Sequence, residues 1–504
     1  MSPSKQTRRL LRVLLVSAEV SPWMKTGGLA DAVAGLADGL AELGQDVRIL
    51  TPAYGATLAA HTNLKLLARF QAPSDLPDSR LLAAAPTRAG AATWLLDHPS
   101  FAEREGNPYL DAQGAAYADN ALRFDRLCRM ACAIAAGRAG ISWRPDIVHA
   151  HDWHAGLLPL RMMLERIAAP NVFTVHNLAY QGIFPRADFD ALGLPQWLWH
   201  PQALEFYGQF SFLKAGLIFG DRLTTVSPSF AREMLTPAYG EGLEGVVQER
   251  AGDLTGIING LDQIAWNPAD DPHIAAKYSA DNLEGKAQNR VALRQSLGLA
   301  DDPKHAVMAM VGRLAPQKGV DLLLGALPEL LQKPLQLVVL GSGLASYEQA
   351  LVKTAAKHPH SLHVTIGYDE VLAHRIVAGA DMFLMPSRYE PCGLAQMEAM
   401  RYGAVPIVRA CGGLADTVTD ASAKNLADGT ATGFHFDAPT VPELLAAVDR
   451  ALKLRRNRAH WRALMQAGMR RDFSWRASAE RYLVLYADAR DRHDGTLARN
   501  GNRV

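Results

Sequence analysis

The sequence predicts an α/β protein with two doubly wound parallel sheets, and three observations support this fold class. Short β-rich apolar runs alternate with helical patterns along the chain, as they do in doubly wound sheets. A segment rich in Gly, Asn and Pro, residues 256–268, separates two sets of such runs and is expected to hold the hinge between two domains. Two related halves are also indicated, because Gly27-G-L-A-D-A-Val33 and Gly412-G-L-A-D-T-Val418 differ at a single position.

Ten apolar runs are expected to form the strands of the two sheets. In the first half they are Val13–Ser17, Val47–Thr51, Ile147–Ala150, Val172–Val175 and Leu223–Val226. In the second half they are Val307–Val311, Leu337–Leu340, Val364–Ile366, Met382–Met385 and Val405–Val408. Residues 71–119 are poorly periodic and are interpreted as strands and loops inserted at the rim of the first domain, with no assignable chemistry.

Two helices can be placed from their apolar faces. Apolar residues at alternating spacings of four and three follow Gly28, and we expect the helix that carries them to end at Gly44. Near the end of the chain, Ser474–Tyr486 is also predicted to be a helix with an apolar face. The polar residues after Ala487 are expected to fray.

Length, charge and hydropathy limit the number of domains and the kinds of partner that can be expected. A chain of 504 residues with 49% hydrophobic content favours more than one domain with large cores. Lys+Arg 52 against Asp+Glu 51 gives no reason to expect nucleic acid or an anionic membrane as a partner. No uncharged apolar stretch reaches the ~18 residues that a spanning helix needs.

The compartment is expected to be the cytoplasm. Lys5–Glu19 superficially resembles a signal peptide, but Arg12 interrupts its apolar run, so we interpret it as a basic tail that enters the first strand. Four cysteines are too few for a disulfide framework in a chain of this length. Cys128 and Cys132 have the spacing of one helix face, which is more typical of a core than of a metal site.

A basic pair and an acidic loop, each just after a predicted strand, are the candidates for chemistry. Arg313 and Lys318 follow Val307–Val311, and two fixed cations can hold a diphosphate and take up charge as it leaves. Glu390 and Glu398 follow Met382–Met385, and a carboxylate can accept hydrogen bonds from sugar hydroxyls. Lys318 is expected in the first turn of a helix and Glu398 in the second turn of another. Together these residues suggest sugar transfer from a nucleotide-diphosphate donor.

Glycine-rich turns accompany these charged residues. Pro391-Cys392-Gly393 predicts a tight turn whose N–H groups could face a phosphate. Lys25 precedes the pair Gly27 and Gly28, where a strand leads into a helix, so its ammonium should lie at the carboxyl end of the sheet, where ligands bind.

A histidine cluster leaves two interpretations open. His149-A-H-D-W-His154 could be a metal site of a hydrolase, although its aspartate stands one place earlier than in the H-x-H-x-D-H string of binuclear hydrolases. We favour a role in sugar binding for Asp152, because no second ligand cluster follows. His176 and Asn177 lie just past another predicted strand, where His176 could hydrogen-bond a substrate hydroxyl.

These residues, in this order, resemble the bacterial glycogen synthases and plant starch synthases. The matching strings are Lys25-T-G-G-L-A-Asp31, His149-A-H-D-W-H-A-G-Leu157, Thr174-V-H-N-L-A-Y-Q-Gly182, Gly256-I-I-N-G-L-Asp262, Gly312-R-L-A-P-Q-K-Gly319 and Pro386-S-R-Y-E-P-C-G-Leu394. The resemblance implies a GT-B fold, with two Rossmann-like domains facing a deep cleft and the last helix crossing back to the first domain. The expected segments are 1–257 on the acceptor side, 258–476 on the nucleotide-sugar side, and 477–504 as that helix with a polar tail.

The resemblance also implies a reaction and a set of roles. The family transfers glucose from a nucleotide sugar, ADP-glucose in its bacterial branch, to the non-reducing 4-hydroxyl of an α-1,4-glucan, with retention and without a metal or other cofactor. Carried over to this sequence, the roles fall on three groups of residues: Lys25, Arg313 and Lys318 at the donor phosphates; Asp152, His176, Asn259 and Glu390 at the glucose; Tyr368 at the base and Glu398 at the ribose. Gly27, Gly28, Cys392, Gly393 and Leu394 complete the expected donor site.

The mechanism by which the configuration is retained stays open, and so do several alternative functions. A covalent intermediate on a carboxylate is the usual route to retention, whereas the resemblance favours a front-face route in which the leaving phosphate deprotonates the acceptor. Another retaining GT-B glucosyltransferase, with UDP-glucose as donor or sucrose as product, is the nearest alternative. A phosphorylase, a metal hydrolase using His149–His154 and an inactive glucan-binding protein are further ones.

Overall fold

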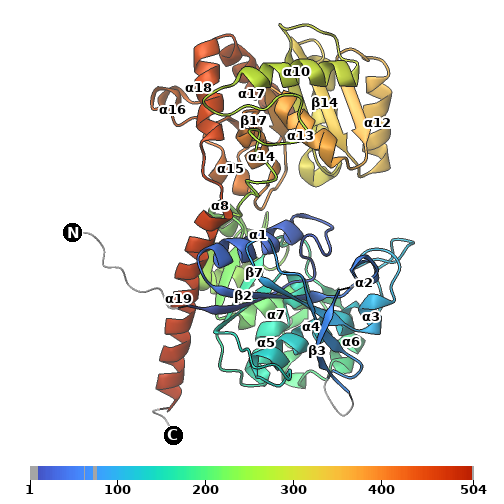
Figure 1. The fold of residues 1–504 in the computed structure, drawn as a ribbon, viewed down its shortest axis with the longest axis vertical. Coiled ribbons are helices and arrows are strands. Elements are labelled where there is room, and N and C mark those ends of the chain that lie inside the picture. Colours follow the sequence, from blue (N-terminus) through green and yellow to red (C-terminus); the bar gives the residue numbers. More distant parts are fainter. Residues whose placement is uncertain (1–9, 62, 72–75, 502–504) are drawn as a thin grey trace, which may run out of the picture. The chain divides into compact units, whose positions relative to one another are not determined.

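The computed structural model describes residues 10–61, 63–71 and 76–501, which form two compact units (Figure 1). The N-terminal unit comprises 1–226, 231–260 and 475–504, and the C-terminal unit comprises 227–230 and 261–474. Each contains a sheet flanked by helices, so the predicted α/β class with two parallel-sheet domains is confirmed. The basic residues 5–9 before the first strand lie outside the described residues.

The N-terminal unit is built on a nine-stranded sheet in the order β12-β11-β7-β6-β1-β2-β5-β4-β3. Its strands are β1 Arg12–Val16, β2 Asp46–Pro52, β3 Lys65–Arg69, β4 Arg80–Ala84, β5 Ala92–Asp97, β6 Ile147–His151, β7 Asn171–Val175, β11 Arg222–Thr225 and β12 Leu254–Gly256. All strand pairs from β12 to β5 are parallel, and β4 is antiparallel to both β3 and β5. The parallel strands β6 and β7 are fully buried, as is typical of central strands in a sheet covered on both faces.

Helices on both faces of this sheet complete the unit. They are α1 Gly28–Glu42, α2 Gly55–Ala60, α3 Pro99–Ala102, α4 Asn120–Ala135, α5 Leu158–Leu164, α6 Arg186–Ala191, α7 Phe212–Phe219, α9 Glu244–Glu249 and α19 Trp475–Gly501; α8, Pro228–Glu233, begins in the other unit. A small sheet is formed by β8 Ile183–Phe184, β9 Glu205–Phe206 and β10 Gln209–Ser211. The apolar stripe of α1 is buried as predicted, and Gly44 follows the helix with a φ of +79°.

The poorly periodic segment 71–119 contributes more than rim insertions. Its β5 pairs in parallel with β2 and has a buried face, so it belongs to the main sheet. Tyr109, from the loops that follow, donates from its hydroxyl to Glu19 near the end of β1. The sequence did not predict this contact, because the partners lie far apart in the chain.

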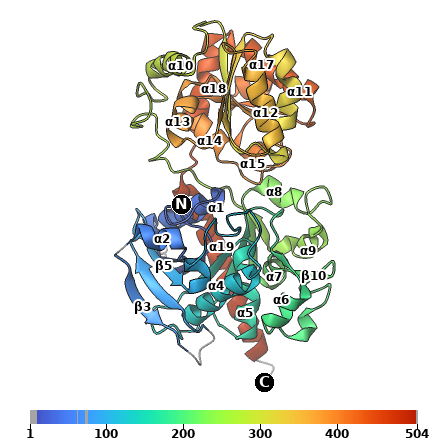
Figure 2. The same ribbon diagram turned by 90° about the vertical axis from the view of Figure 1, so that its right-hand side faces the viewer.

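The C-terminal unit holds a six-stranded parallel sheet in the order β15-β14-β13-β16-β17-β18. Its strands are β13 Ala306–Val311, β14 Leu335–Gly341, β15 Leu362–Ile366, β16 Met382–Met385, β17 Val405–Arg409 and β18 Phe434–Phe436. Its helices are α10 Glu284–Leu297, α11 Val320–Leu330, α12 Ala345–Ala355, α13 Glu370–Gly379, α14 Ala395–Arg401, α15 Gly412–Thr417, α16 Ala423–Ala427, α17 Val441–Arg455 and α18 Arg458–Met469. Helices α10 and α13 lie on one face of this sheet, and α11, α12 and α17 lie on the other (Figure 2).

The last helix, α19, packs back on the N-terminal unit, as expected. Tyr482 and Tyr486 are buried in the core that α1 and β1 share with α19. At the start of α19, Trp475 lies directly against two glycines of α1: a Cβ on Gly35 would come within 1.9 Å of the indole Nε1, and one on Gly39 within 2.6 Å of the Trp475 carbonyl oxygen. The absence of side chains at these glycines lets the two helices approach closely.

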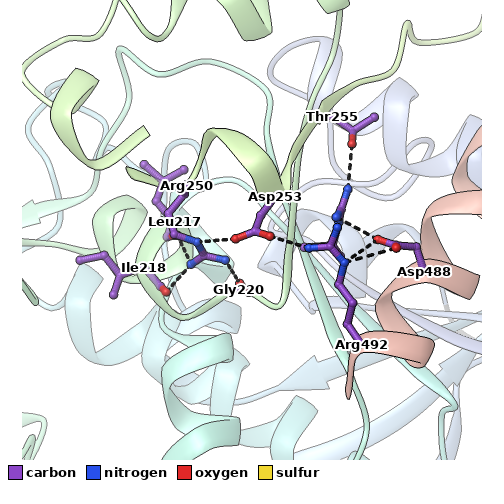
Figure 3. Close-up of polar contacts among 9 residues, drawn as sticks. Leu217, Ile218, Gly220, Arg250, Asp253, Thr255, Asp488 and Arg492 are labelled. Atoms are coloured by element: carbon purple, nitrogen blue, oxygen red, sulfur yellow. Dashed lines mark hydrogen bonds and ion pairs between the residues drawn. The ribbon is translucent and has the colours of Figure 1, made fainter. Parts of the chain in front are cut away.

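The prediction that the chain frays after Ala487 is wrong, because α19 continues to Gly501. Polar residues of its later turns are paired with the edge of the sheet. Asp488 pairs with Arg222 of β11 at 2.9 Å. Arg492 pairs with Asp253 at 2.7 Å (Figure 3). Arg250 donates to Asp253 at 2.9 Å and also to carbonyl oxygens at the end of α7. A polar tail can therefore be helical when its charges meet partners from distant segments.

Nothing in the described part of the chain is both helical and long and apolar enough to cross a membrane. All four cysteines lie within the described residues, are buried and form no disulfide.

We predict that Gly39→Ala lowers the thermal unfolding midpoint, because the new methyl group would overlap the Trp475 carbonyl and force α1 and α19 apart. Overpacking of this kind costs about 1–3 kcal/mol. Gly245→Ala is the matched control: it also adds a methyl group to a helical glycine, but a Cβ there meets no atom within 4 Å. Scanning calorimetry of both variants gives the comparison, and equal midpoints would contradict the close approach of α1 and α19.

Candidate functional site

In the C-terminal unit, Lys318 and Glu390 form an ion pair at the carboxyl edge of the sheet. They follow β13 and β16, which are parallel neighbours. The Lys318 Nζ lies 2.5 Å from Glu390 Oε2, and the Ser387 hydroxyl donates to the same oxygen at 3.1 Å. Glu390 is only 5% exposed. A cation is thus held in one position by a carboxylate that is itself fixed.

The loop that carries Arg313 packs against the loop that carries Glu390. Gln317 accepts from Arg313 at 3.4 Å and donates to the Tyr389 carbonyl at 3.4 Å. Gly319 has a φ of +68°, and a Cβ there would come within 1.9 Å of the Pro386 carbonyl oxygen. Lys318 lies in the first turn of a helix, as predicted, but this helix is the short 3₁₀ helix Pro316–Lys318, and α11 begins only after Gly319.

Helix α14 and the turn before it hold Cys392, Gly393, Leu394 and Glu398. The side chain of Gln396 donates to the carbonyls of Cys392 at 3.1 Å and Gly393 at 2.9 Å, which fixes the turn. Leu394 is the N-cap of α14, and Glu398 lies in the first turn and not in the predicted second turn, because the helix begins at Ala395.

Two glycines of the similar strings, Gly27 and Gly413, have different surroundings. A Cβ on Gly413 would come within 2.1 Å of the Cys392 carbonyl oxygen, so this glycine is required by the close approach of two backbone segments. A Cβ on Gly27 would meet no atom within 4 Å, so packing does not require a glycine at this position. Both strings begin a helix, as the sequence predicts.

In the N-terminal unit, a buried carboxylate that the sequence analysis did not single out shapes the Lys25 loop. Glu19, which is 3% exposed, accepts from Thr26 N at 2.5 Å, Thr26 Oγ1 at 2.6 Å and Gly27 N at 3.3 Å. Lys25 itself pairs with Asp31 at 2.8 Å. The position of Glu19, just past the end of the buried strand β1, was the available signal.

Asp152 and His176 meet where the parallel strands β6 and β7 end. Asp152 Oδ1 accepts from the His176 backbone N–H at 3.0 Å. Asp152 has a φ of +58°, which is uncommon for a residue other than glycine and points to a constrained position. Burial raises the pKa of Asp152 to about 7 and lowers the pKa of His176 to about 3.

Two further predicted residues, Asn259 and Tyr368, follow other strands. Asn259, three residues after β12, is 7% exposed. Tyr368 follows β15, two strands away from β13, and is 77% exposed.

Two histidines of the string, His149 and His151, hydrogen-bond to other side chains of the protein. His149 uses both ring nitrogens, Nδ1 with the Tyr486 hydroxyl at 2.8 Å and Nε2 with Thr174 Oγ1 at 2.6 Å. His151 bonds to His176, and His154 stacks on Tyr109 with ring centroids 4.6 Å apart. Over the described ranges, no three His, Cys, Asp or Glu side chains are arranged to hold a metal ion.

A hollow of about 470 Å³ opens beside Trp153, the neighbour of Asp152. Tyr180 and Phe206 also line it, together with Gln181 and Glu241. Tyr180 is 50% exposed. Aromatic faces beside a few polar groups suit a ligand that has both apolar and hydroxyl-bearing surfaces.

Comparison with known protein families and sequences identifies relatives along nearly the whole chain. Residues 12–249 match the model of the starch synthase catalytic domain, and residues 292–464 match that of glycosyl transferases group 1. The chain is 52% identical over 479 residues to glycogen synthase 1 of Methylococcus capsulatus, covering 95% of this chain and 97% of that protein. It is 50% identical over 480 residues to the glycogen synthase of Thioalkalivibrio sulfidiphilus, covering 95% and 99%.

Solved structures show the same fold. The catalytic domain of starch synthase IV from Arabidopsis thaliana, bound to ADP and acarbose, superposes with a TM-score of 0.85 at 30% identity, covering 96% of this chain and all of that one. The sucrose-phosphate synthase of Thermosynechococcus elongatus matches with a TM-score of 0.57 at 18% identity, covering 95% and 98%, and shows likeness of fold alone.

We predict that Asp152→Asn changes how stability depends on pH. Because the folded-state pKa of Asp152 is raised to about 7, its contribution to stability is full below the unfolded pKa, near 4, and is lost as the pH rises through about 7. The loss is at most about 1.4 kcal/mol for each pH unit in this window. Asparagine does not titrate, so the variant should gain in unfolding midpoint relative to the native protein between pH 5 and 8.

Thermal unfolding at several pH values measures this difference, and the buried histidines common to both proteins largely cancel from it. A midpoint difference that stays constant from pH 5 to 8 would contradict the raised pKa.

Proposed function

The chain belongs to the glycogen and starch synthase family, and on this premise we propose that it transfers glucose from ADP-glucose to the non-reducing 4-hydroxyl of an α-1,4-glucan with retention of configuration. The observation that carries the proposal is the Lys318–Glu390 pair, with Arg313 on the adjoining loop. A binding protein has no need of cations fixed to take up the charge of a leaving group, whereas a transferase does. Starch synthase IV of Arabidopsis, solved with ADP, supports an adenine nucleotide as the donor.

The site residues take the roles that the sequence resemblance implies. Lys25, Arg313 and Lys318 neutralise the donor phosphates; Asp152, His176, Asn259 and Glu390 hold the glucose; Tyr368 contacts the base and Glu398 the ribose; and the turns with Gly27, Gly28, Cys392, Gly393 and Leu394 receive the donor. The fixed geometry around Glu390 and Asp152 supports these roles, because each carboxylate is buried and hydrogen-bonded before any ligand arrives.

We propose a front-face route for the reaction. The departing phosphate takes the proton from the incoming hydroxyl, and the new glycosidic bond forms on the face from which the phosphate leaves. The ammonium group of Lys318 is already held in place by Glu390. The Lys318 side chain therefore loses little further conformational freedom when the bond to the phosphate breaks. Glu390 serves in this route by holding Lys318 and the sugar, not as a nucleophile.

We propose that neither a metal nor another cofactor takes part. The basic side chains Lys25, Arg313 and Lys318 supply the positive charge that a metal supplies in other transferases. Both ring nitrogens of His149 are engaged within the protein, so His149 is poorly suited to bind a metal. The partners are ADP-glucose and glycogen, with no nucleic acid or membrane, and we place the enzyme in the cytoplasm, where buried free thiols are stable.

The acceptor glucan is proposed to bind in the hollow beside Trp153. We predict that Tyr180→Ala raises the glycogen concentration needed for half-maximal rate by about threefold to tenfold, because an aromatic face that packs on sugar rings is lost. The maximal rate and the KM for ADP-glucose should change little. Trp197→Ala is the control, since Trp197 is an exposed aromatic residue, 59% accessible, that does not line this hollow. Equal glycogen KM values in the two variants would remove the hollow from the acceptor site.

We predict that Arg313→Ala, Lys318→Ala and Glu390→Ala each lower turnover by more than about tenfold with the fold intact. Each substitution removes either a contact to the donor or the side chain that holds Lys318 in place. Radiolabel incorporation from ADP-glucose into glycogen measures turnover, and circular dichroism checks the fold. Lys424→Ala is the matched control: Lys424 also pairs with a carboxylate, Asp428 at 3.0 Å, but its side chain is 83% exposed.

The double variant of Lys318 and Glu390 sharpens this test. Since the two side chains act as a pair, their effects should be clearly less than additive. Normal turnover in the single variants would defeat the assignment of the site.

A further inference from the structure

His151 contacts the one histidine that the proposed function uses. Its Nδ1 lies 3.0 Å from Nε2 of His176, so one of these nitrogens carries a hydrogen and the other accepts it. The other ring nitrogen of His176, Nδ1, has no hydrogen-bond partner among the residues that the structure describes. His176 therefore has one nitrogen tied to the protein and one left for a ligand.

The surroundings of His151 decide which nitrogen donates. His151 is 1% exposed, and its Nε2 is buried with no hydrogen-bond partner in the described part of the chain. If Nε2 carried the hydrogen, a donor would be stranded in the core, at a cost of about 1–3 kcal/mol. If Nδ1 carries it, only a lone pair is stranded, and buried acceptors without partners are less rare than buried donors without partners.

We propose that His151 is a positioning residue that donates from Nδ1 to His176 Nε2 and thereby holds His176 in the tautomer that presents Nδ1–H to an oxygen of the bound sugar. The sugar's presence at His176 rests on the proposed function, whereas the tautomer does not. A neutral imidazole has one donor and one acceptor, so fixing Nε2 as the acceptor fixes Nδ1 as the donor. This gives the string His149–His154 a role that no metal is needed to explain.

The ring of His151 packs against the ring of His149. Its centroid lies 4.0 Å from that of His149, which is tied to Tyr486 of α19 and to Thr174 of β7. Burial lowers the pKa values of His149, His151 and His176. The other titratable groups near this row are Asp152, His154, Glu19, Tyr482 and Tyr486. The three histidines are thus neutral near pH 7, and the contact between His151 and His176 couples the tautomers of these two rings.

The experiment is ¹⁵N NMR of the full-length protein with labelled histidine, in the native form and in three variants. We expect His176 in the native protein to show a protonated Nδ1 and an unprotonated Nε2. His151→Leu removes the donor and should release His176 to a mixture of tautomers. His151→Asn keeps an N–H at the same place and should retain the native pattern, and His154→Phe, which keeps the stacked ring and does not touch His176, should also retain it.

Kinetics with ADP-glucose then test the role. We expect His151→Leu to lower kcat/KM by about tenfold or more and His151→Asn to restore it to within about threefold of native. A protonated Nε2 on His176 in the native protein would overturn the proposal, and this measurement does not depend on any variant folding. Native kinetics in His151→Leu would overturn the positioning role while leaving the glucosyltransferase intact. Absence of transfer in the native protein itself would count against the proposed function and not against the tautomer.

Discussion

Parallel pairing of neighbouring strands is the constraint on which both clusters of the candidate site depend. Because β13 and β16 run side by side in the same direction, the loops that follow them emerge at one edge, and Lys318 can reach Glu390. The neighbours β6 and β7 bring Asp152 to His176 in the same way. Residues far apart in sequence thus meet because the sheets are parallel.

Buried carboxylates then fix what the strands bring together. Glu19 holds the backbone of the Lys25 loop, Asp152 holds the His176 backbone, and Glu390 holds the Lys318 ammonium. Each is less than a tenth exposed, so its hydrogen bonds act in surroundings where they are stronger than in water. The loops that would receive the ligand are therefore shaped before the ligand binds.

Local patterns predicted the parts of the molecule that depend on local causes. The buried strands and the stripe of α1 follow from apolar periodicity, and Lys318, Glu390, Asp152 and His176 were found because each stands just after such a strand. Contacts between distant segments were not predictable in this way. The sequence alone does not show that Arg222 pairs with Asp488, and for this reason the tail was expected to fray. It also does not show that Thr26 and Tyr109 both donate hydrogen bonds to Glu19.

We propose that fixed protein cations, and not a metal, drive glucose transfer from ADP-glucose to an α-1,4-glucan. The most direct measurement is glucose incorporation into glycogen from ADP-glucose and from UDP-glucose in parallel, each with and without EDTA. The account predicts transfer from ADP-glucose that is unaffected by EDTA and exceeds transfer from UDP-glucose. Loss of transfer in EDTA, or no transfer from either donor by the folded protein, would contradict this proposal. Either result would favour the alternative interpretation of His149–His154 as a metal site.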